Sequence, residues 1–208
     1  MRIEIKDDFL NKEDLLELSH LNLEKIKDDE VKVYHNKIFK NRGVESECLD
    51  EATIKRLNDR YHSLAMQTLN LLYPEKCVLY DYSEFHIIYT GKNYKFPIHD
   101  DTPNKLLSGV IYLKPEKNVG TIFYRSRFGK DKKIIDWKVN RAVFFSRKES
   151  ESWHSYEGDG INNRLALVYN LMTTRIRDVY KIEKKNYLLG YIRFKINPYL
   201  FQYFKFTL

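Results

Sequence analysis

The chain has 208 residues and a formal net charge of +7, and its 43% hydrophobic and 31% charged residues are typical of one globular domain. Its few glycines and prolines exclude collagen-like and low-complexity classes, and no apolar run is long enough to cross a bilayer. A charged N-terminus argues against a secretory signal, and two cysteines, Cys48 and Cys77, cannot build a disulfide framework or a cysteine-based zinc site, so we expect a cytoplasmic protein.

Two helices are predicted in the first third of the chain. Asn11 is a good N-cap, because acidic residues and then leucines follow it. Apolar residues recur at helical spacing from Ile54 to Leu72, and Pro74 ends that run. We therefore expect residues 1–75 to form a helical support segment.

Short segments rich in β-branched and aromatic residues follow from Cys77 onward, separated by glycine- and asparagine-containing turns. The predicted strands are Val78–Ser83, Phe85–Thr90, Tyr94–Ile98, Leu106–Leu113, Thr121–Arg125, Lys133–Lys138, Arg141–Ser146, Trp153–Tyr156 and Arg164–Leu171. Many short strands after a helical start predict a mainly β fold with flanking helices (α+β), a β-sandwich or a jelly roll, with its core in residues 76–174. Strands and helices do not alternate, which argues against a doubly wound nucleotide-binding sheet.

The C-terminal extension, residues 175–208, carries most of the positive charge. Eight basic residues and two acidic residues lie from Arg175 to Leu208, interleaved with many aromatic residues. We expect this segment to pack on the domain or to form a homodimer contact, within a single domain. Contact with a membrane surface is the alternative, since aromatic and basic residues together suit an interface.

The segment around His99 holds the most informative residues for chemistry. His99 and Asp101 are two positions apart, so in an extended chain both side chains point to one face, while Asp100 points away. His154 lies on a separate predicted strand. Two histidines and one carboxylate are the ligand set of non-haem Fe(II) oxygenases, although a hydrogen-bonded structural role is the ordinary alternative for a strand histidine.

Arg164 follows His154 by ten residues, across a Gly-Asp-Gly turn, and opens an apolar strand. A guanidinium at that place needs an anion, and its planar fork fits a carboxylate. A pair with an acidic side chain of the chain itself is the alternative.

Together these residues resemble the Fe(II)- and 2-oxoglutarate-dependent dioxygenases, most closely the prolyl 4-hydroxylase-like group. His-x-Asp, a second histidine and an arginine ten residues later are that family's pattern. The resemblance covers about residues 80–171, and four more segments fit it in order: Tyr89-Thr90-Gly91, Ser108 to Leu113, Gly120 to Phe123 and Val139 to Ser146.

The resemblance implies a double-stranded β-helix, a cupin-like jelly roll with the N-terminal helices packed on one sheet. It implies an oxidoreductase that uses Fe(II), 2-oxoglutarate and O2, with ascorbate as an aid, to hydroxylate a C–H bond while 2-oxoglutarate is converted to succinate and CO2. The implied Fe(II) ligands are His99, Asp101 and His154. The implied 2-oxoglutarate-binding residues are Arg164, Tyr112 and Tyr89, and no catalytic residue beyond the metal ligands is implied.

Departures from the family pattern leave the primary substrate open. Ala166 replaces a serine or threonine of some relatives, and Asn170 stands where oxygen-sensing prolyl hydroxylases have tryptophan. Prolyl peptides, small molecules and sugar or lipid precursors remain candidates. An AlkB-like nucleic-acid dealkylase is one alternative, but that family has a second arginine at the position of Asn170, so we do not expect a nucleic-acid partner. A non-catalytic jelly-roll binding module is another alternative, and the intact ligand set argues against it.

Overall fold

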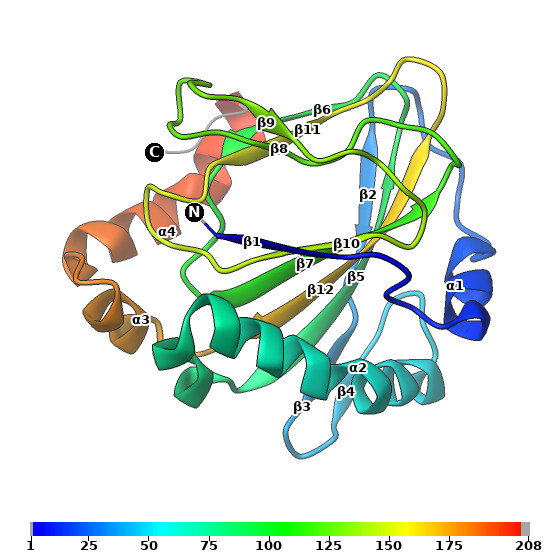
Figure 1. Cartoon of the computed structure of the whole chain (residues 1–208). Helices are drawn as coiled ribbons and strands as arrows, with labels where there is room; N and C mark the ends of the chain where they lie inside the picture. Colours follow the sequence, from blue (N-terminus) through cyan, green and yellow to red (C-terminus); the bar gives the residue numbers. More distant parts are fainter. Residues whose placement is uncertain (1, 205–208) are drawn as a thin grey trace.

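Two antiparallel sheets face one another in the computed structural model, which describes residues 2–204 (Figure 1). The main sheet has eight strands in the order β1-β10-β7-β12-β5-β3-β4, with β2 also paired to β5. Its strands are β1 (Ile3–Lys6), β2 (Val31–Tyr34), β3 (Lys37–Phe39), β4 (Val44–Glu45), β5 (Tyr82–Thr90), β7 (Lys105–Lys114), β10 (Ala142–Phe145) and β12 (Arg164–Met172).

The smaller sheet has four strands in the order β6-β11-β8-β9. These strands are β6 (Lys95–His99), β8 (Ile122–Phe123), β9 (Lys133–Ile134) and β11 (His154–Glu157). From β5 to β12 the chain passes back and forth between the sheets, with β5, β7, β10 and β12 in one and β6, β8, β9 and β11 in the other. This alternation confirms the predicted jelly roll.

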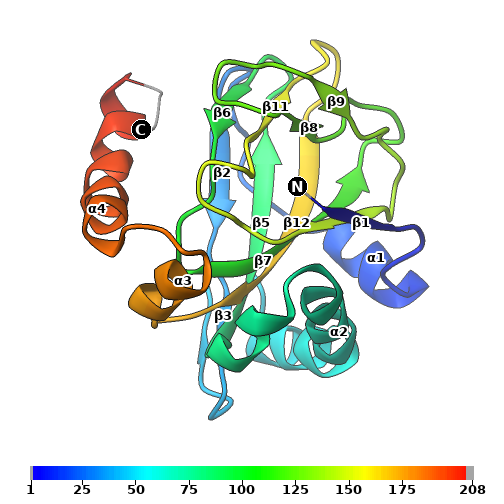
Figure 2. The same ribbon diagram turned by 60° about the vertical axis from the view of Figure 1, so that its left-hand side comes forward.

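The N-terminal helices α1 (Lys12–Ser19) and α2 (Glu51–Leu72) cover the outer face of the main sheet, as predicted (Figure 2). Asp50 caps α2, because its side chain accepts a hydrogen bond from the backbone N–H of Thr53 at 2.8 Å. The apolar stripe of α2 is buried at Ile54, Leu57 and Leu69. Burial of this stripe on the sheet, more than helix propensity, stabilises the helix.

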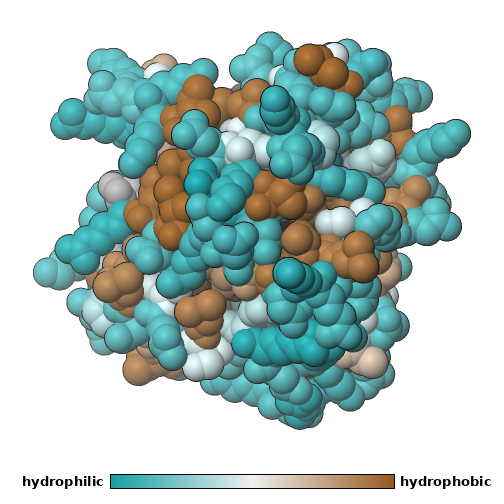
Figure 3. All heavy atoms as spheres, turned by 45° about the vertical axis from the view of Figure 1, so that its right-hand side comes forward, coloured by the Kyte–Doolittle hydropathy of each residue, from teal (hydrophilic) through white to brown (hydrophobic). Residues whose placement is uncertain are grey.

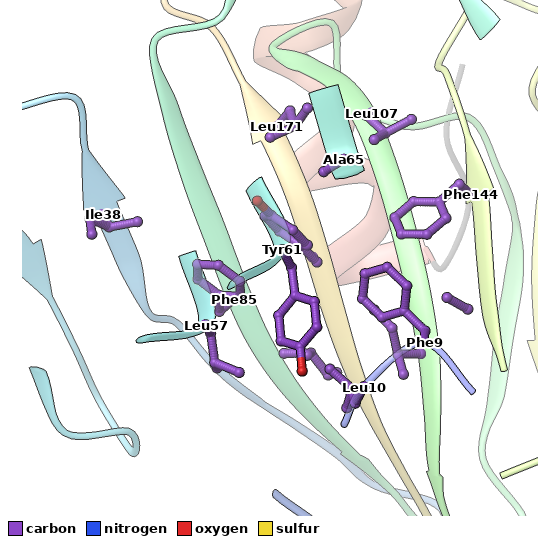
Figure 4. Close-up of a cluster of buried hydrophobic side chains, with 14 of the residues drawn as sticks. Phe9, Leu10, Ile38, Leu57, Tyr61, Ala65, Phe85, Leu107, Phe144 and Leu171 are labelled. Atoms are coloured by element: carbon purple, nitrogen blue, oxygen red, sulfur yellow. The ribbon is translucent and has the colours of Figure 1, made fainter. Parts of the chain in front are cut away.

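The main hydrophobic core lies between α2 and the sheet (Figure 4). Leu57, Tyr61 and Ala65 of the helix point toward Phe85, Leu107 and Leu171 of three neighbouring strands. These side chains are almost wholly buried, so the core fixes the positions of β5, β7 and β12. The same three strands carry site residues on their opposite face.

Several elements differ from the prediction. A 3-10 helix, η1 (Pro74–Leu79), takes up the first two residues of the segment predicted as a strand over Val78–Ser83, because Pro74 presets a helical φ and starts a new turn. β5 then runs without interruption through Tyr82–Thr90. The short strands β1 to β4 were not predicted. They join the main sheet, so residues 1–75 contribute strands as well as helices.

The C-terminal extension forms two helices that the sequence analysis did not predict, α3 (Ile176–Ile182) and α4 (Tyr187–Phe204). α4 contains Pro198, and α3 and α4 are in contact. Gly190 lies so close to Tyr180 that a Cβ built on it would be 2.1 Å from the ring, so only glycine permits this packing. Lys205 and Phe206, part of the predicted basic aromatic extension, lie outside the described residues.

The surface mixes polar and apolar side chains. On the face shown in Figure 3, apolar atoms form several patches that polar side chains separate. Within residues 2–204, no helix combines the length and apolar character needed to cross a membrane.

Candidate active site

The three predicted metal ligands meet at one end of the smaller sheet. β6 ends at His99, β11 begins at His154, and the two residues are directly opposite in the antiparallel pair. Their ring centroids are 4.1 Å apart. Asp101 follows β6, and the candidate ligand atoms of all three residues lie within 4.8 Å of one another. The structure therefore brings together side chains 55 positions apart in sequence at one point.

Both imidazoles are held in the tautomer that a metal requires. Nδ1 of His99 lies 3.0 Å from the carbonyl oxygen of Pro97, and Nδ1 of His154 lies 2.8 Å from that of Ser152. A carbonyl oxygen only accepts, so each Nδ1 carries the proton and donates. Each Nε2 is left as the lone-pair atom, which is the usual arrangement of a metal-binding histidine.

The electrostatics of the cluster keep the ligands ready at neutral pH. Burial, and then the neighbouring His154, lower the pKa of His99 to about 3. Burial also lowers the pKa of His154. Burial alone would raise the pKa of Asp101, but the charge of Lys105 and the two imidazoles hold it well below its usual range. The set is therefore two neutral imidazoles and one carboxylate.

Asp101 has two further polar partners. Nζ of Lys105 lies 2.8 Å from one carboxylate oxygen, and the hydroxyl of Ser108 donates to the other at 2.6 Å. Both partners come from β7, so the main sheet orients a ligand that follows a strand of the smaller sheet. Sequence reasoning missed both residues, although Ser108 lies in the segment that carried the family resemblance.

Asp100 is not part of the cluster, as the alternation predicted. Its carboxylate accepts from the backbone N–H of Ser150 at 2.7 Å and contacts the hydroxyl of Ser152. Burial raises the pKa of Asp100 to about 7. Through these two hydrogen bonds, Asp100 anchors the loop that leads to His154.

Arg164 is buried with 6% of its surface exposed, and it has no acidic partner. Its guanidinium lies 3.9 Å from the ring centroid of Tyr156 and 5.3 Å from that of Trp137. Within residues 2–204 no carboxylate forms an ion pair with it, and its Nε has no hydrogen-bond partner. A buried guanidinium without an anion is costly, so this residue fits an anionic ligand.

A cavity between the two sheets joins the ligands to Arg164. It is lined by His99, Asp101 and His154 at one end, by Arg164, Tyr156 and Thr121 at the other, and by apolar side chains that include Ile88, Val110, Phe145, Ala166 and Val168. A metal-binding end, an apolar middle and a cationic end match a molecule that chelates a metal and carries a distant carboxylate. The residues present therefore fit Fe(II) and 2-oxoglutarate.

The two predicted tyrosines have different positions. The buried ring of Tyr112 lies 5.5 Å from the Arg164 guanidinium, but its hydroxyl donates to Thr121 Oγ1 at 3.0 Å and accepts from the Thr121 N–H at 2.7 Å. Tyr89 does not reach the cavity. It packs on the helix-covered face, where Asn163 lies 3.3 Å from its hydroxyl, while its neighbours Ile88 and Thr90 line the cavity.

Two aromatic residues at the Arg164 end, Tyr156 and Trp137, were missed as site residues. Tyr156 could have been found from its position two residues after His154, which places both on one side of a strand. Trp137 stacks on Tyr112 with ring centroids 4.3 Å apart, a contact that no local pattern indicates.

A second cavity meets the first at the metal ligands. His99, Asp101, Lys105 and Phe96 line both cavities. The second is further lined by Trp153 and Tyr180 and by residues of α4: Arg193, Phe194, Asn197 and Pro198. The ligand cluster thus lies between a cavity inside the jelly roll and another under the C-terminal helix.

Comparison with solved structures shows the same fold in known oxygenases, whereas no protein-family profile and no curated protein matches the sequence. A prolyl-4-hydroxylase from Pseudomonas putida has a TM-score of 0.54 and 14% identity, covering 82% of this chain and 92% of its own. A 2OG-Fe(II) oxygenase family oxidoreductase from Burkholderia pseudomallei has a TM-score of 0.54 and 14% identity, covering 82% and 84%.

A prolyl hydroxylase from Trichoplax adhaerens, solved with a hypoxia inducible factor peptide fragment, has a TM-score of 0.54 and 16% identity, covering 85% of this chain and 86% of its own. At such low identity the likeness establishes the jelly-roll fold of these oxygenases. The chemistry of this chain has to be argued from its own residues.

Proposed function

We propose that the protein is an Fe(II)- and 2-oxoglutarate-dependent dioxygenase, a hydroxylase similar to prolyl hydroxylases. One observation carries the proposal: a two-histidine, one-carboxylate cluster and an unpaired buried arginine lie at opposite ends of one cavity. The fold supports the proposal, because solved oxygenases share it.

The residues at the two ends of the cavity have different proposed roles. His99, His154 and Asp101 would hold iron through two Nε2 atoms and a carboxylate oxygen, and Arg164 would bind the distal carboxylate of 2-oxoglutarate. Tyr112 would support that end by fixing Thr121 beside the guanidinium. When bound, iron and 2-oxoglutarate would supply the oxidation, in which 2-oxoglutarate, O2 and the substrate are converted to succinate, CO2 and the hydroxylated substrate. The apolar walls exclude water from that site.

The second cavity is the proposed place of the primary substrate, because it reaches the metal ligands from the other side. Its arginines already have acidic partners: Arg147 contacts Glu183 at 2.8 Å, and Arg193 contacts Glu149 at 3.0 Å. Aromatic side chains make up much of the remaining wall. An uncharged reactive group, such as an apolar side chain of a peptide, fits this lining better than a phosphate does.

The outer surface of α4 supports a contact with a second copy of the chain or with a membrane surface. Leu188, Tyr199 and Phe204 are each about two-thirds exposed, at 66%, 66% and 68%. Sedimentation at several protein concentrations would detect a dimer, and co-pelleting with anionic vesicles would detect membrane contact. Both remain predictions, as does a cytoplasmic location, which the two free thiols at Cys48 and Cys77 favour.

Spectroscopy tests the cofactor set without knowledge of the substrate. Anaerobic addition of Fe(II) and 2-oxoglutarate should produce a weak visible charge-transfer band, and His99→Ala should abolish it. His20→Ala, on the exposed end of α1, is the matched control and should keep the band. A wild-type protein with neither a band nor succinate release in the presence of ascorbate would reject the proposal.

A succinate-release screen would then identify the substrate class. Peptides, free amino acids, nucleotide sugars and methylated oligonucleotides should be compared under the same conditions. Release driven by methylated oligonucleotides would favour the dealkylase alternative. Absence of both metal binding and succinate release with all of these substrates would favour the binding-module alternative.

A further inference from the structure

A buried cluster of charged side chains lies behind the metal ligands. Lys76 of η1 and Glu183 after α3 are wholly buried, with Lys76 Nζ 2.7 Å from a Glu183 carboxylate oxygen. Arg147, 2% exposed, donates to the other Glu183 oxygen at 2.8 Å and contacts Glu149. Glu149 also accepts from the Tyr180 hydroxyl at 3.0 Å. The cluster therefore joins η1, the loop before β11 and the C-terminal helices.

Arg147 extends this cluster to a metal ligand. Its Nε donates to the backbone carbonyl oxygen of Asp101 at 3.1 Å, while its two terminal nitrogens reach Glu183 and Glu149. One rigid guanidinium thus connects the segment that carries Asp101 with the loop that leads to His154. Lysine could not reproduce this arrangement, because its three donors share one nitrogen, whereas the guanidinium reaches the three acceptors with three separate nitrogens.

We infer that Arg147 is a positioning residue for the metal-binding carboxylate of Asp101, and that Glu183 completes its anchor. The inference rests on the proposed metal site and adds residues that the site itself does not contain. Asp101 follows the end of β6 without a strand partner of its own, so its backbone needs another support. Arg147 supplies that support at the backbone carbonyl, whereas Lys105 and Ser108 contact the carboxylate.

Energetics favour this role over simple stabilisation. Removing several charges from water costs free energy that their mutual attraction only partly returns, and apolar residues of similar volume often stabilise a core as well. What such a cluster provides is a fixed geometry. Here the fixed geometry is the spacing between two ligand-bearing segments, and outer partners of this kind typically change metal affinity by about 10- to 100-fold when replaced.

The C-terminal helices are consequently part of the site. Glu183 ends α3, and Arg193 of α4 donates to Glu149 at 3.0 Å. One basic residue of this extension, Arg193, therefore pairs with a buried acidic group. Part of the positive charge of this segment thus forms an ion pair inside the molecule.

Cobalt(II) titration of the whole protein tests the inference without turnover. Arg147→Lys keeps the charge but loses the contact with the Asp101 carbonyl, so the Kd for Co(II) should rise at least tenfold with a changed visible d–d spectrum. Arg56→Lys is the matched control, since Arg56 contacts Asp14 at 3.0 Å and Glu17 on the helical face. It should lower the Tm without changing the Kd.

Glu183→Gln is the second variant, in case Arg147→Lys does not fold. It keeps the shape of the side chain and should raise the Kd in the same direction by a smaller factor. A folded Arg147→Lys protein with the wild-type Kd and spectrum would overturn the inference alone. Unfolding of both variants would make the cluster a folding element and also overturn it. A wild-type protein that binds no Co(II) or Fe(II) would overturn the proposed function together with this inference.

Discussion

The two faces of the main sheet are made by the same strands but serve opposite purposes. On β12, Leu165, Leu167 and Tyr169 pack into the core beneath α2, whereas Arg164, Ala166 and Val168 line the cavity. The helix-covered face is closed and apolar. The cavity face carries the buried cation of Arg164 and lies opposite the imidazoles of the smaller sheet. Alternation along a strand therefore lets one segment hold the fold together and also present the site.

Loss of a metal ligand should have the largest effect and should leave the helix-covered face intact. Asp101→Ala should abolish Fe(II) binding and turnover, and it should also lower the Tm, because it removes the buried partner of Lys105. Asp100→Asn should keep bound iron, because Asp100 faces the loop at Ser150 instead of the cluster. Iron analysis and Tm on both variants check this. Equal loss of iron from the two would show that the site is arranged differently.

A core substitution should produce the opposite result. Leu167→Ala removes a side chain that is 1% exposed and should cost about 3 kcal/mol of unfolding free energy, with the KM for 2-oxoglutarate unchanged. Val168→Ala, the next residue, should cost less stability and should change that KM, because it lines the cavity. Urea unfolding and succinate assays separate the two. A shifted KM in Leu167→Ala would mean that the faces are coupled.

Removal of the buried cation should lower affinity but not stability. Arg164→Met should raise the KM for 2-oxoglutarate by roughly thirtyfold, corresponding to about 2 kcal/mol for a charge-assisted pair. The Tm of the metal-free protein should stay constant or increase, since an unpaired buried charge is removed. Succinate release at varied 2-oxoglutarate tests the first expectation and calorimetry the second. An unchanged KM would assign Arg164 another role.

The smallest effect should be that of pH on metal affinity. Protons compete with the metal for imidazoles, and a site with two ordinary histidines of pKa about 6.5 would lose roughly tenfold in affinity between pH 8 and pH 6. Here burial holds the pKa of His99 at about 3 and lowers that of His154, so no proton needs to be displaced in that range. Co(II) affinity should therefore fall by clearly less than tenfold over this range. A tenfold fall by pH 6 would contradict the neutral ligand set.

Sequence reasoning succeeded where the signal was local. The His-x-Asp spacing, the ten-residue spacing from His154 to Arg164 and the apolar strand that Arg164 opens are short-range patterns, and the structure brings these residues to one cavity. The apolar stripe of α2 was likewise predicted from its helical spacing. Tyr89 was assigned to the site by resemblance alone, yet its strand neighbours Ile88 and Thr90 occupy the cavity face.

The parts that were missed depend on long-range partners. The strands β2 and β3 are short and form on the edge of the long strand β5, and β4 in turn pairs with β3. α4 is rich in aromatic and β-branched residues and contains Pro198, so local propensity argued against a helix. Lys76 and Glu183 are 107 positions apart, and no spacing rule indicates that pair.

The ammonium group of Lys105 gives the carboxylate of Asp101 a counter-charge that belongs to the polypeptide itself. A newly made chain therefore does not depend on a captured ion to neutralise this buried anion, and it can complete its folding first. Iron would then bind to a chain that is already folded, and it would replace the ammonium group of Lys105 as the main counter-charge of Asp101. Supply of the metal would set how much of the protein is active, and bound metal would add to the stability of the folded state.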